Sequence, residues 1–169
     1  YQCQMHAIDL WGDALAGWKV GRVGVALEAA LGAERLIGAL FAGNIFLAEP
    51  GRAVEAPAIE GGFAAVEAEF VYRLAEDAPA TKLEWTNAEA LALVAGMHIG
   101  IELAGSPLPH INDMGPTIVA ADFGNNAGLI LGPPIADWRT RTDDQLACEM
   151  FVDGLAAGRG AADSLPGGP

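Results

Sequence analysis

The sequence has few basic residues, few cysteines and no long apolar run. Its 169 residues include 9 lysines and arginines against 22 aspartates and glutamates, for a formal net charge of −13. This balance repels phosphate backbones and anionic lipid surfaces, so neither nucleic acid nor a membrane is an expected partner. Apolar runs such as Ile99–Leu103 and Gly128–Gly132 are far shorter than the roughly 20 residues that span a bilayer. A small anionic substrate remains compatible, because a bound divalent cation reverses the local field.

Cysteine and histidine are also scarce and show no metal-type spacing. Cys3 and Cys148 are the only cysteines and lie far apart, which favours a reducing compartment, the cytoplasm, over a secreted disulfide scaffold. His6, His98 and His110 form no HxxxH or HxH pattern and are interpreted as packing or surface residues. The phosphate-binding patterns GxGxxG and GxxxxGK[ST] are missing, so no nucleotide cofactor is expected.

What is present is enough apolar sequence for one core, in helices first and short strands later. Apolar residues make up 52% of the chain, and its length predicts one domain over 1–169. Periodicity and turn residues predict helices over 1–16, 25–31 and 86–95, and strands over 66–74, 97–104, 117–121, 128–132 and 146–152. Residues 18–21 are predicted to be a short strand or an extended turn. Residues 37–46, interrupted by glycines, are predicted to be irregular, and the tail 154–169 shows no periodic pattern. This order predicts an α+β fold with a mixed or mainly antiparallel sheet.

Two acidic residues alternate with apolar ones in the clearest predicted strand. Because side chains alternate faces along a strand, Glu67 and Glu69 are expected to point the same way, with Val66 and Phe70 on the opposite face. Two like charges at this spacing repel unless a cation or solvent lies between them. Carboxylate oxygens are the ligands that Mg²⁺ and Mn²⁺ prefer, so the pair is a candidate metal site. The alternative interpretation is an ordinary solvated strand face.

Lys19 and the segment 122–126 are further candidates. Lys19 lies between Gly17 and Gly21, which would let backbone and substrate approach closely. Its ammonium could pair with a substrate carboxylate or assist proton transfer, although a surface turn lysine is the alternative. The segment Asp122–Asn126 ends in two asparagines beside a glycine, which is typical of a binding loop or of a plain turn.

Taken in order, five segments resemble the 2-keto-4-pentenoate hydratase and 4-oxalocrotonate decarboxylase group of the fumarylacetoacetate hydrolase superfamily. Gly17–Gly21 resembles the family's GxKxG segment, and Ile37–Phe41 resembles its FGxL segment. Val66–Phe70 resembles its VEAEhxF segment, where h is apolar. Ile101–Leu103 resembles the start of its EIxDSR segment, and Ala121-Asp122 with Gly128–Gly132 resembles its ADN…GLxxLG segment. The resemblance covers roughly residues 1–160. It implies an α+β, fumarylacetoacetate hydrolase-like mixed β-sheet/barrel fold with flanking helices, incomplete at both ends.

The resemblance also implies a function. It suggests a cytoplasmic, metal-dependent hydro-lyase of aromatic-compound catabolism, with Mg²⁺ or Mn²⁺ held by Glu67 and Glu69 and with Lys19 in catalysis. The substrate would be a 2-hydroxy-2,4-dienoate, hydrated to a 4-hydroxy-2-oxo acid. A 4-oxalocrotonate-type decarboxylase, which needs the same chelation, and a non-catalytic scaffold relative are the alternatives. A homo-oligomer is expected, with a decarboxylase or hydratase subunit as a further possible partner.

Three departures from the family pattern leave the ligand set open. Gly105 stands where the resemblance places a third metal-binding acid, and Gly43 stands where it places a second family acid. The turn at Asp122 is also one residue longer than the family's. Glu102 or Asp122 is a candidate replacement for the missing ligand. The chain is further expected to be a fragment of low activity, because the resembled family extends beyond both of its ends.

Overall fold

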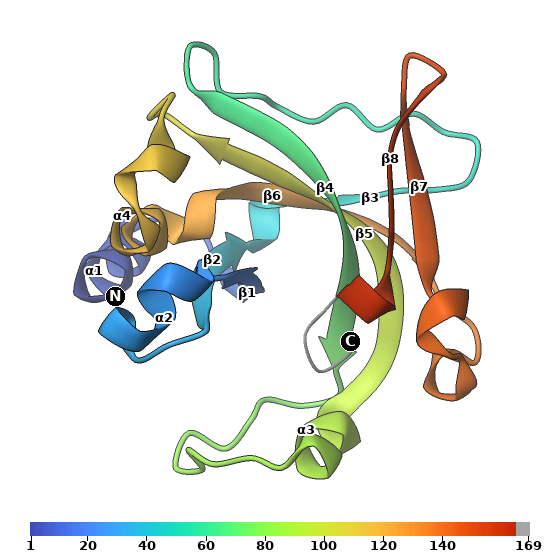
Figure 1. The fold of residues 1–169 in the computed structure, drawn as a ribbon, viewed down its shortest axis with the longest axis horizontal. Coiled ribbons are helices and arrows are strands. Elements are labelled where there is room, and N and C mark those ends of the chain that lie inside the picture. Colours follow the sequence, from blue (N-terminus) through green and yellow to red (C-terminus); the bar gives the residue numbers. More distant parts are fainter. Residues whose placement is uncertain (165–169) are drawn as a thin grey trace. The chain divides into compact units, whose positions relative to one another are not determined.

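A computed structural model describes residues 1–164 and confirms the α+β class (Figure 1). The helices are α1 (Gln2–Leu10), α2 (Val25–Leu31), α3 (Asn87–Leu93) and α4 (Pro116–Ala121). The strands are β1 (Leu15–Arg22), β2 (Arg35–Phe41), β3 (Ile45–Leu47), β4 (Phe63–Leu74), β5 (Val94–Ser106), β6 (Asn126–Pro134), β7 (Ala147–Val152) and β8 (Leu155–Ala161). Short 3-10 turns join several of these elements.

The strands form three sheets and no closed barrel within residues 1–164. β1 and β2 pair antiparallel, β7 and β8 pair antiparallel, and a four-stranded sheet has the order β3-β6-β5-β4. β3 runs parallel to β6, with Phe46 opposite Ile130. The part of the chain that the structure describes contains no helix long and apolar enough to cross a membrane.

The chain divides into two compact units, and β4, β5 and β6 contribute residues to both. One unit comprises residues 1–67 and 101–131, and the other comprises 68–100 and the chain from 132 onward. The first unit has a small core of Val23, Leu36 and Ala120, with Val119 packed against it. The second has a core of Met97, Leu146 and Ala162, flanked by partly buried hydrophobic residues that include Phe70, Tyr72, Ile135 and Trp138. Burial there raises the pKa of the Tyr72 hydroxyl.

The interpretation of residues 37–46 as irregular is wrong, because most of the segment is strand. β2 is buried at every position from Gly38 to Phe41 and pairs along its length with β1. A Cβ at Gly38 would lie 1.7 Å from the Phe123 carbonyl oxygen, so this glycine is required by a close backbone approach. Gly38 therefore marks a packed strand and not a break in one.

Residues 117–121, predicted as a strand, form helix α4. Gly115 precedes the helix and Pro116 occupies its first turn, where the missing N–H costs nothing. The β-branched run that favoured a strand is overruled by this start and by packing of Ala120 and Val119 into the core. The first helix is also shorter than the predicted 1–16: it ends at Leu10, and Leu15 already begins β1.

The tail contains a hairpin that the periodicity analysis missed. Val152 pairs with Leu155, and the two residues between them, Asp153 and Gly154, have φ of 52° and 79°. An Asp-Gly pair with positive φ at both positions is a favoured two-residue hairpin turn. Residues 165–169 of the predicted patternless tail lie outside the described residues.

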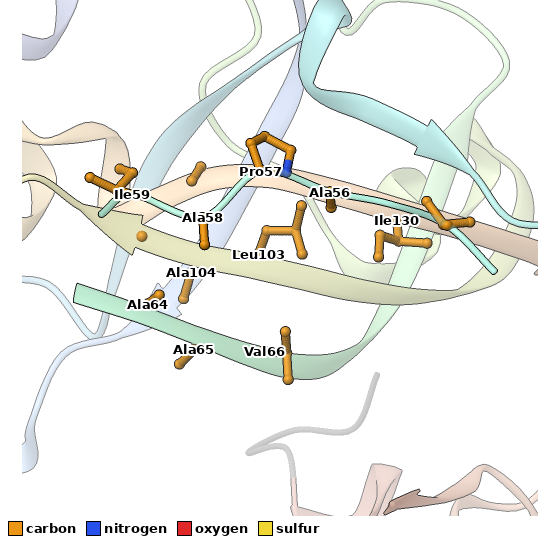
Figure 2. Close-up of a pocket in the computed structure, with 13 residues that line it drawn as sticks. Ala56, Pro57, Ala58, Ile59, Ala64, Ala65, Val66, Leu103, Ala104 and Ile130 are labelled. Carbon is orange, nitrogen blue, oxygen red and sulfur yellow. The ribbon is translucent and has the colours of Figure 1, made fainter. Parts of the chain in front are cut away.

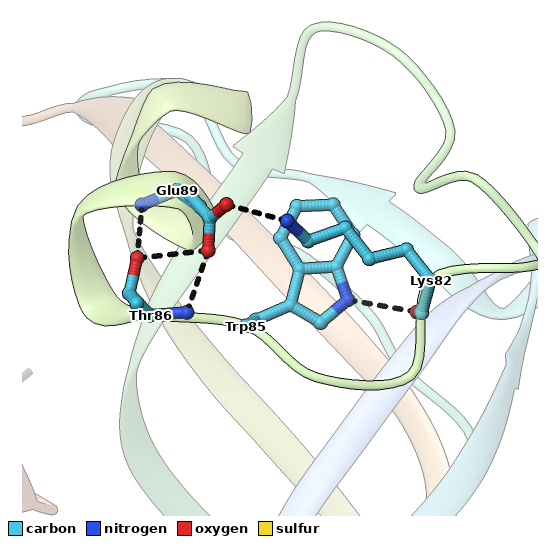
Figure 3. A network of polar contacts seen from close by, with 4 residues as sticks. All are labelled: Lys82, Trp85, Thr86 and Glu89. Atoms are coloured by element: carbon cyan, nitrogen blue, oxygen red, sulfur yellow. Dashed lines mark hydrogen bonds and ion pairs between the residues drawn. The ribbon is translucent and has the colours of Figure 1, made fainter.

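The expected helix after Thr86 and the strand after Val66 are both confirmed. The Thr86 hydroxyl accepts from the Glu89 N–H, while the Glu89 carboxylate accepts from the Thr86 N–H (Figure 3). These reciprocal bonds satisfy two otherwise unpaired donors at the start of α3. The Lys82 Nζ forms an ion pair with Glu89 and lies 4.7 Å from the centre of the Trp85 ring. These contacts connect the start of α3 to the loop that precedes it.

Candidate metal centre

Three glutamates converge on neighbouring strands of the four-stranded sheet. Glu67 and Glu69 are two residues apart on β4, so strand alternation gives them the same face. Glu102 lies on β5, the neighbour of β4. Each residue offers one carboxylate oxygen, and these three oxygens all lie within 4.8 Å of one another. The structure thus brings the two predicted metal residues together with a third carboxylate.

Glu102 is a buried carboxylate whose two oxygens have different surroundings. Its side chain is only 3% exposed. Oε1 lies 2.9 Å from Lys19 Nζ and accepts a 3.0 Å hydrogen bond from Asn126 Nδ2. Oε2 is buried and has no hydrogen-bond partner among the described residues. Leaving a buried charged oxygen unpaired is costly, so Oε2 is suited to accept a cation.

Lys19 lies on β1, and its side chain is 16% exposed. Its Nζ donates to the Gly124 carbonyl at 3.1 Å as well as pairing with Glu102. Cβ atoms placed at Gly21 and Gly124 would each lie 3.3 Å from the lysine stem, so a larger residue at either place would crowd it. Gly21 and Gly124 therefore leave room for the Lys19 side chain itself, and the expected close approach of a substrate at Gly17 and Gly21 stays a prediction. The surface-turn alternative does not describe this largely buried side chain.

The segment Asp122–Asn126 is a tight loop that ends at the start of β6. Phe123, Gly124 and Asn125 all have positive φ, and Asn125 is 6% exposed. The Asn125 amide donates to Asn112 at 3.3 Å. Asp122 does not join the carboxylate group among the described residues. Of the two candidate replacements for the missing ligand, the structure therefore brings Glu102 to the glutamate pair and leaves Asp122 apart.

The two glycines that stand in place of family acids have different surroundings. A Cβ at Gly105 would lie 2.9 Å from the Ala127 Cβ, so this position has no room for a carboxylate. The Gly43 N–H, by contrast, donates to Asp13 Oδ2 at 2.7 Å, and a Cβ at Gly43 would meet the same oxygen. The carboxylate of Asp13 thus occupies the space that a side chain at position 43 would need.

The residues present fit a divalent metal of the Mg²⁺ or Mn²⁺ type. Three carboxylates within reach of one ion are oxygen ligands of the kind that these cations prefer, with water or substrate completing the shell. A cation would also relieve the repulsion between three like charges, which Lys19 offsets only in part. The unpaired Glu102 Oε2 is an independent sign of fit. Sequence reasoning missed Asn126 as a partner of Glu102, because no local pattern links β5 to β6.

An aliphatic cavity lies in the first unit, lined in part by strand neighbours of these glutamates (Figure 2). It has a volume of about 400 Å³. Val66 and Leu103, the neighbours of Glu67 and Glu102, are among its walls, and Ala56–Ile59 crosses it. Its full lining is Val54, Ala56, Pro57, Ala58, Ile59, Ala64, Ala65, Val66, Leu103, Ala104, Gly105, Ala127 and Ile130. No charged side chain lines it, so the ionic chemistry lies with the glutamates.

Comparison with known proteins finds solved structures of similar fold. No protein-family model matches the sequence, and no curated protein matches it. Among solved structures, 4-oxalocrotonate decarboxylase from Pseudomonas putida G7 complexed with calcium and acetate is similar, with a TM-score of 0.59 and 17% identity. The same enzyme complexed with magnesium and adipate gives a TM-score of 0.56, also at 17% identity. Each match covers 93% of this chain and 57% of the other chain. Over almost its whole length the chain therefore has the fold of part of this decarboxylase.

Proposed function

We propose that this chain is the metal-binding part of a divalent-metal-dependent lyase that acts on a small 2-oxo acid. The observation that carries the proposal is the convergence of Glu67, Glu69 and Glu102, with Lys19 Nζ 2.9 Å from Glu102. The fold of a decarboxylase that has been crystallised with calcium and with magnesium supports the same class of enzyme.

The three glutamates would hold Mg²⁺ or Mn²⁺. When bound, such an ion supplies Lewis-acid stabilisation of negative charge on the carboxylate and 2-oxo oxygens of the substrate. Glu102 would offer Oε2, because its Oε1 is already occupied by Lys19 and Asn126.

Lys19 is the candidate proton-handling group. Its Nζ is held at two points, by Glu102 and by the Gly124 carbonyl, and its side chain is largely buried. A positioned ammonium can hold a proton near a developing enolate and can offset the charge of the substrate carboxylate. Lys19→Met is therefore expected to reduce turnover more than it reduces metal affinity.

Two reactions share this arrangement. Hydration of a 2-hydroxy-2,4-dienoate to a 4-hydroxy-2-oxo acid is favoured by the motif resemblance, and decarboxylation of a 4-oxalocrotonate-type substrate is favoured by the structural neighbours. In both reactions the three glutamates would hold the ion, and the ion would supply Lewis-acid stabilisation at the substrate's carboxylate and its oxygen at C2. We further propose that the chain acts in the cytoplasm, either as a homo-oligomer or in a complex with a complementary hydratase or decarboxylase subunit.

The test is calorimetric titration of the intact protein with Mn²⁺, followed by assays with 2-hydroxypenta-2,4-dienoate and with 4-oxalocrotonate. Glu67→Gln should weaken Mn²⁺ binding by about 100-fold, since loss of a ligand should cost at least as much as the 10- to 100-fold typical of a supporting residue. Glu149→Gln, which removes an exposed acid from β7, is the matched control and should bind as the unsubstituted protein does.

The outcomes separate the alternatives. Turnover of one substrate identifies the reaction, and a protein that does not bind Mn²⁺ favours the scaffold relative. Equal Mn²⁺ affinity in Glu67→Gln and Glu149→Gln would exclude the glutamates as the metal site.

A further inference from the structure

The two oxygens of Glu102 are held unequally, and this asymmetry bears on which metal the site accepts. Oε1 receives the Lys19 ammonium at 2.9 Å and the Asn126 amide at 3.0 Å, while the buried Oε2 receives no hydrogen bond from the described residues. Two donors fill the lone-pair positions of Oε1. A metal can then reach Glu102 through Oε2 alone, as a single-oxygen ligand.

The number of oxygens that a carboxylate offers distinguishes the common divalent cations. Mg²⁺ requires a small, near-octahedral shell, and a bidentate carboxylate fits that shell poorly. Ca²⁺ is larger, takes six to eight oxygens and readily accepts both oxygens of a carboxylate. A glutamate that is held to one oxygen therefore favours Mg²⁺ or Mn²⁺ over Ca²⁺.

Asn126 is the neutral member of this arrangement, and the fold fixes its place. It is the first residue of β6 and directly follows the loop whose Phe123 carbonyl abuts Gly38. That loop also presents the Gly124 carbonyl to Lys19. The same backbone approach thus positions both donors to Oε1. Removal of Asn126 changes the hydrogen bonding of Glu102. Because Asn126 is uncharged, this removal leaves the net charge of the site unchanged.

We infer that Asn126 is a positioning residue that sets metal selectivity, by keeping Glu102 monodentate and so favouring Mg²⁺ and Mn²⁺ over Ca²⁺. The inference rests on the proposed metal site. It concerns a residue that is not itself a ligand and that acts through the orientation of Glu102. Supporting residues of this kind commonly change metal affinity by about 10- to 100-fold.

The experiment is calorimetric titration of the intact protein and of Asn126→Leu with Mg²⁺, Mn²⁺ and Ca²⁺ separately. Leucine has a similar shape and no N–H donor, so one of the two occupied positions on Oε1 becomes available to the metal, while Lys19 keeps the other. The Mg²⁺ affinity should fall by about 10-fold, while the Ca²⁺ affinity should stay equal or rise. Asn126→Ala, which adds no bulk, is measured in parallel, and thermal unfolding checks that each variant is folded.

Asn125→Gly is the matched control from the same loop. Glycine tolerates the φ of 64° at this position, and the change removes an amide that bonds Asn112 instead of Glu102. Its Mg²⁺-to-Ca²⁺ affinity ratio should equal that of the unsubstituted protein.

The results distinguish the inference from the proposed function on which it rests. Metal binding that Asn126→Leu and Asn126→Ala weaken equally for all three ions, or leave unchanged, overturns the selectivity role and leaves the metal site standing. An unsubstituted protein that binds none of the ions overturns both. A ratio that shifts toward Ca²⁺ in both variants and not in Asn125→Gly supports the role of Asn126.

Discussion

Two lysine–glutamate pairs in this protein have similar contacts and opposite settings. Lys82 and Glu89 pair at the surface, with side chains 36% and 46% exposed, while Lys19 and Glu102 are 16% and 3% exposed. Both carboxylate oxygens of Glu89 accept hydrogen bonds, Oε1 from Lys82 and Oε2 from the backbone N–H and hydroxyl of Thr86 (Figure 3). Glu102 instead keeps one oxygen without a partner. The surface pair completes a helix start, whereas the buried pair leaves one oxygen of Glu102 unpaired in a group of three carboxylates.

The difference shows that a short ion-pair distance does not itself indicate function. An exposed pair is screened by solvent and contributes little to stability. A buried pair is costly to desolvate. A buried polar atom that is left without a hydrogen-bond partner therefore requires an explanation, such as a role in binding an ion. The candidate site is therefore identified by two observations: one buried oxygen of Glu102 has no partner among the described residues, and the carboxylates of Glu67, Glu69 and Glu102 lie close together.

The largest effect is expected from breaking the buried pair. Lys19→Met leaves Glu102 as a buried charge without its cation and should lower the metal-free unfolding free energy by about 3–5 kcal/mol. The matched change at the surface, Lys82→Met, should cost about 0–1 kcal/mol. Urea unfolding of both variants measures the difference. Mn²⁺ should restore part of the loss in Lys19→Met, because ligands that bind only the folded state stabilise it. Equal losses in the two variants would contradict the contrast between the pairs.

A smaller effect is expected from adding an acid beside the buried site. Gly105→Asp forces a Cβ to within 2.9 Å of the Ala127 Cβ and should destabilise the protein by about 1–3 kcal/mol. It should not tighten Mn²⁺ binding. Gly158→Asp on β8 is the control, since no atom lies within 4 Å of the Cβ position there, and it should change thermal stability little. If Gly105→Asp had normal stability and bound Mn²⁺ more tightly, the conclusion that position 105 has no room for a metal-binding acid would be wrong.

A still smaller effect is expected at the surface network. Thr86→Ala removes the cap of α3 and should cost about 1 kcal/mol. Thr81→Ala, a change in the preceding turn, caps no helix and serves as the control. Hydrogen exchange of the α3 amides should increase in Thr86→Ala, while Mn²⁺ affinity stays unchanged. A change in Mn²⁺ affinity would mean that the surface network and the metal site are coupled.

The smallest effect is the pH dependence of that network. The Lys82 side chain first, and then the backbone and hydroxyl of Thr86, lower the pKa of Glu89 below its usual 4.5. The ionised form is therefore favoured in the folded state, so its contribution is present above pH 4.5 and is lost as the pH falls through the lowered pKa. Exchange of the α3 amides should increase over that acidic range, and Glu89→Gln should remove this pH dependence. A pH dependence that persists in Glu89→Gln would assign it to another group.

The elements that could be predicted from the sequence are those held by local interactions. The capping box at Thr86, the alternation around Glu67 and Glu69, and the strand predicted over 97–104, which lies within β5, follow from the preferences of neighbouring residues. The Asp153-Gly154 turn is also encoded locally, by the preference of an Asp-Gly pair for a two-residue hairpin turn and not by hydrophobic periodicity. The α4 segment differs from its predicted strand because its β-branched residues favour strands when considered alone, whereas Pro116 at its first turn favours a helix.

By itself, the sequence determined an acidic α+β protein whose clearest strand carries two glutamates on one face, because alternation and charge act over a few residues. Only the tertiary structure decided that Glu102 is the third carboxylate, that Lys19 and Asn126 hold one of its oxygens, and that position 105 has no room for an acid. These contacts join β1, β5 and β6, which are far apart along the chain. Their distances depend on which strands pair and how closely backbones such as those of Gly38 and Phe123 approach, and no local pattern encodes that packing.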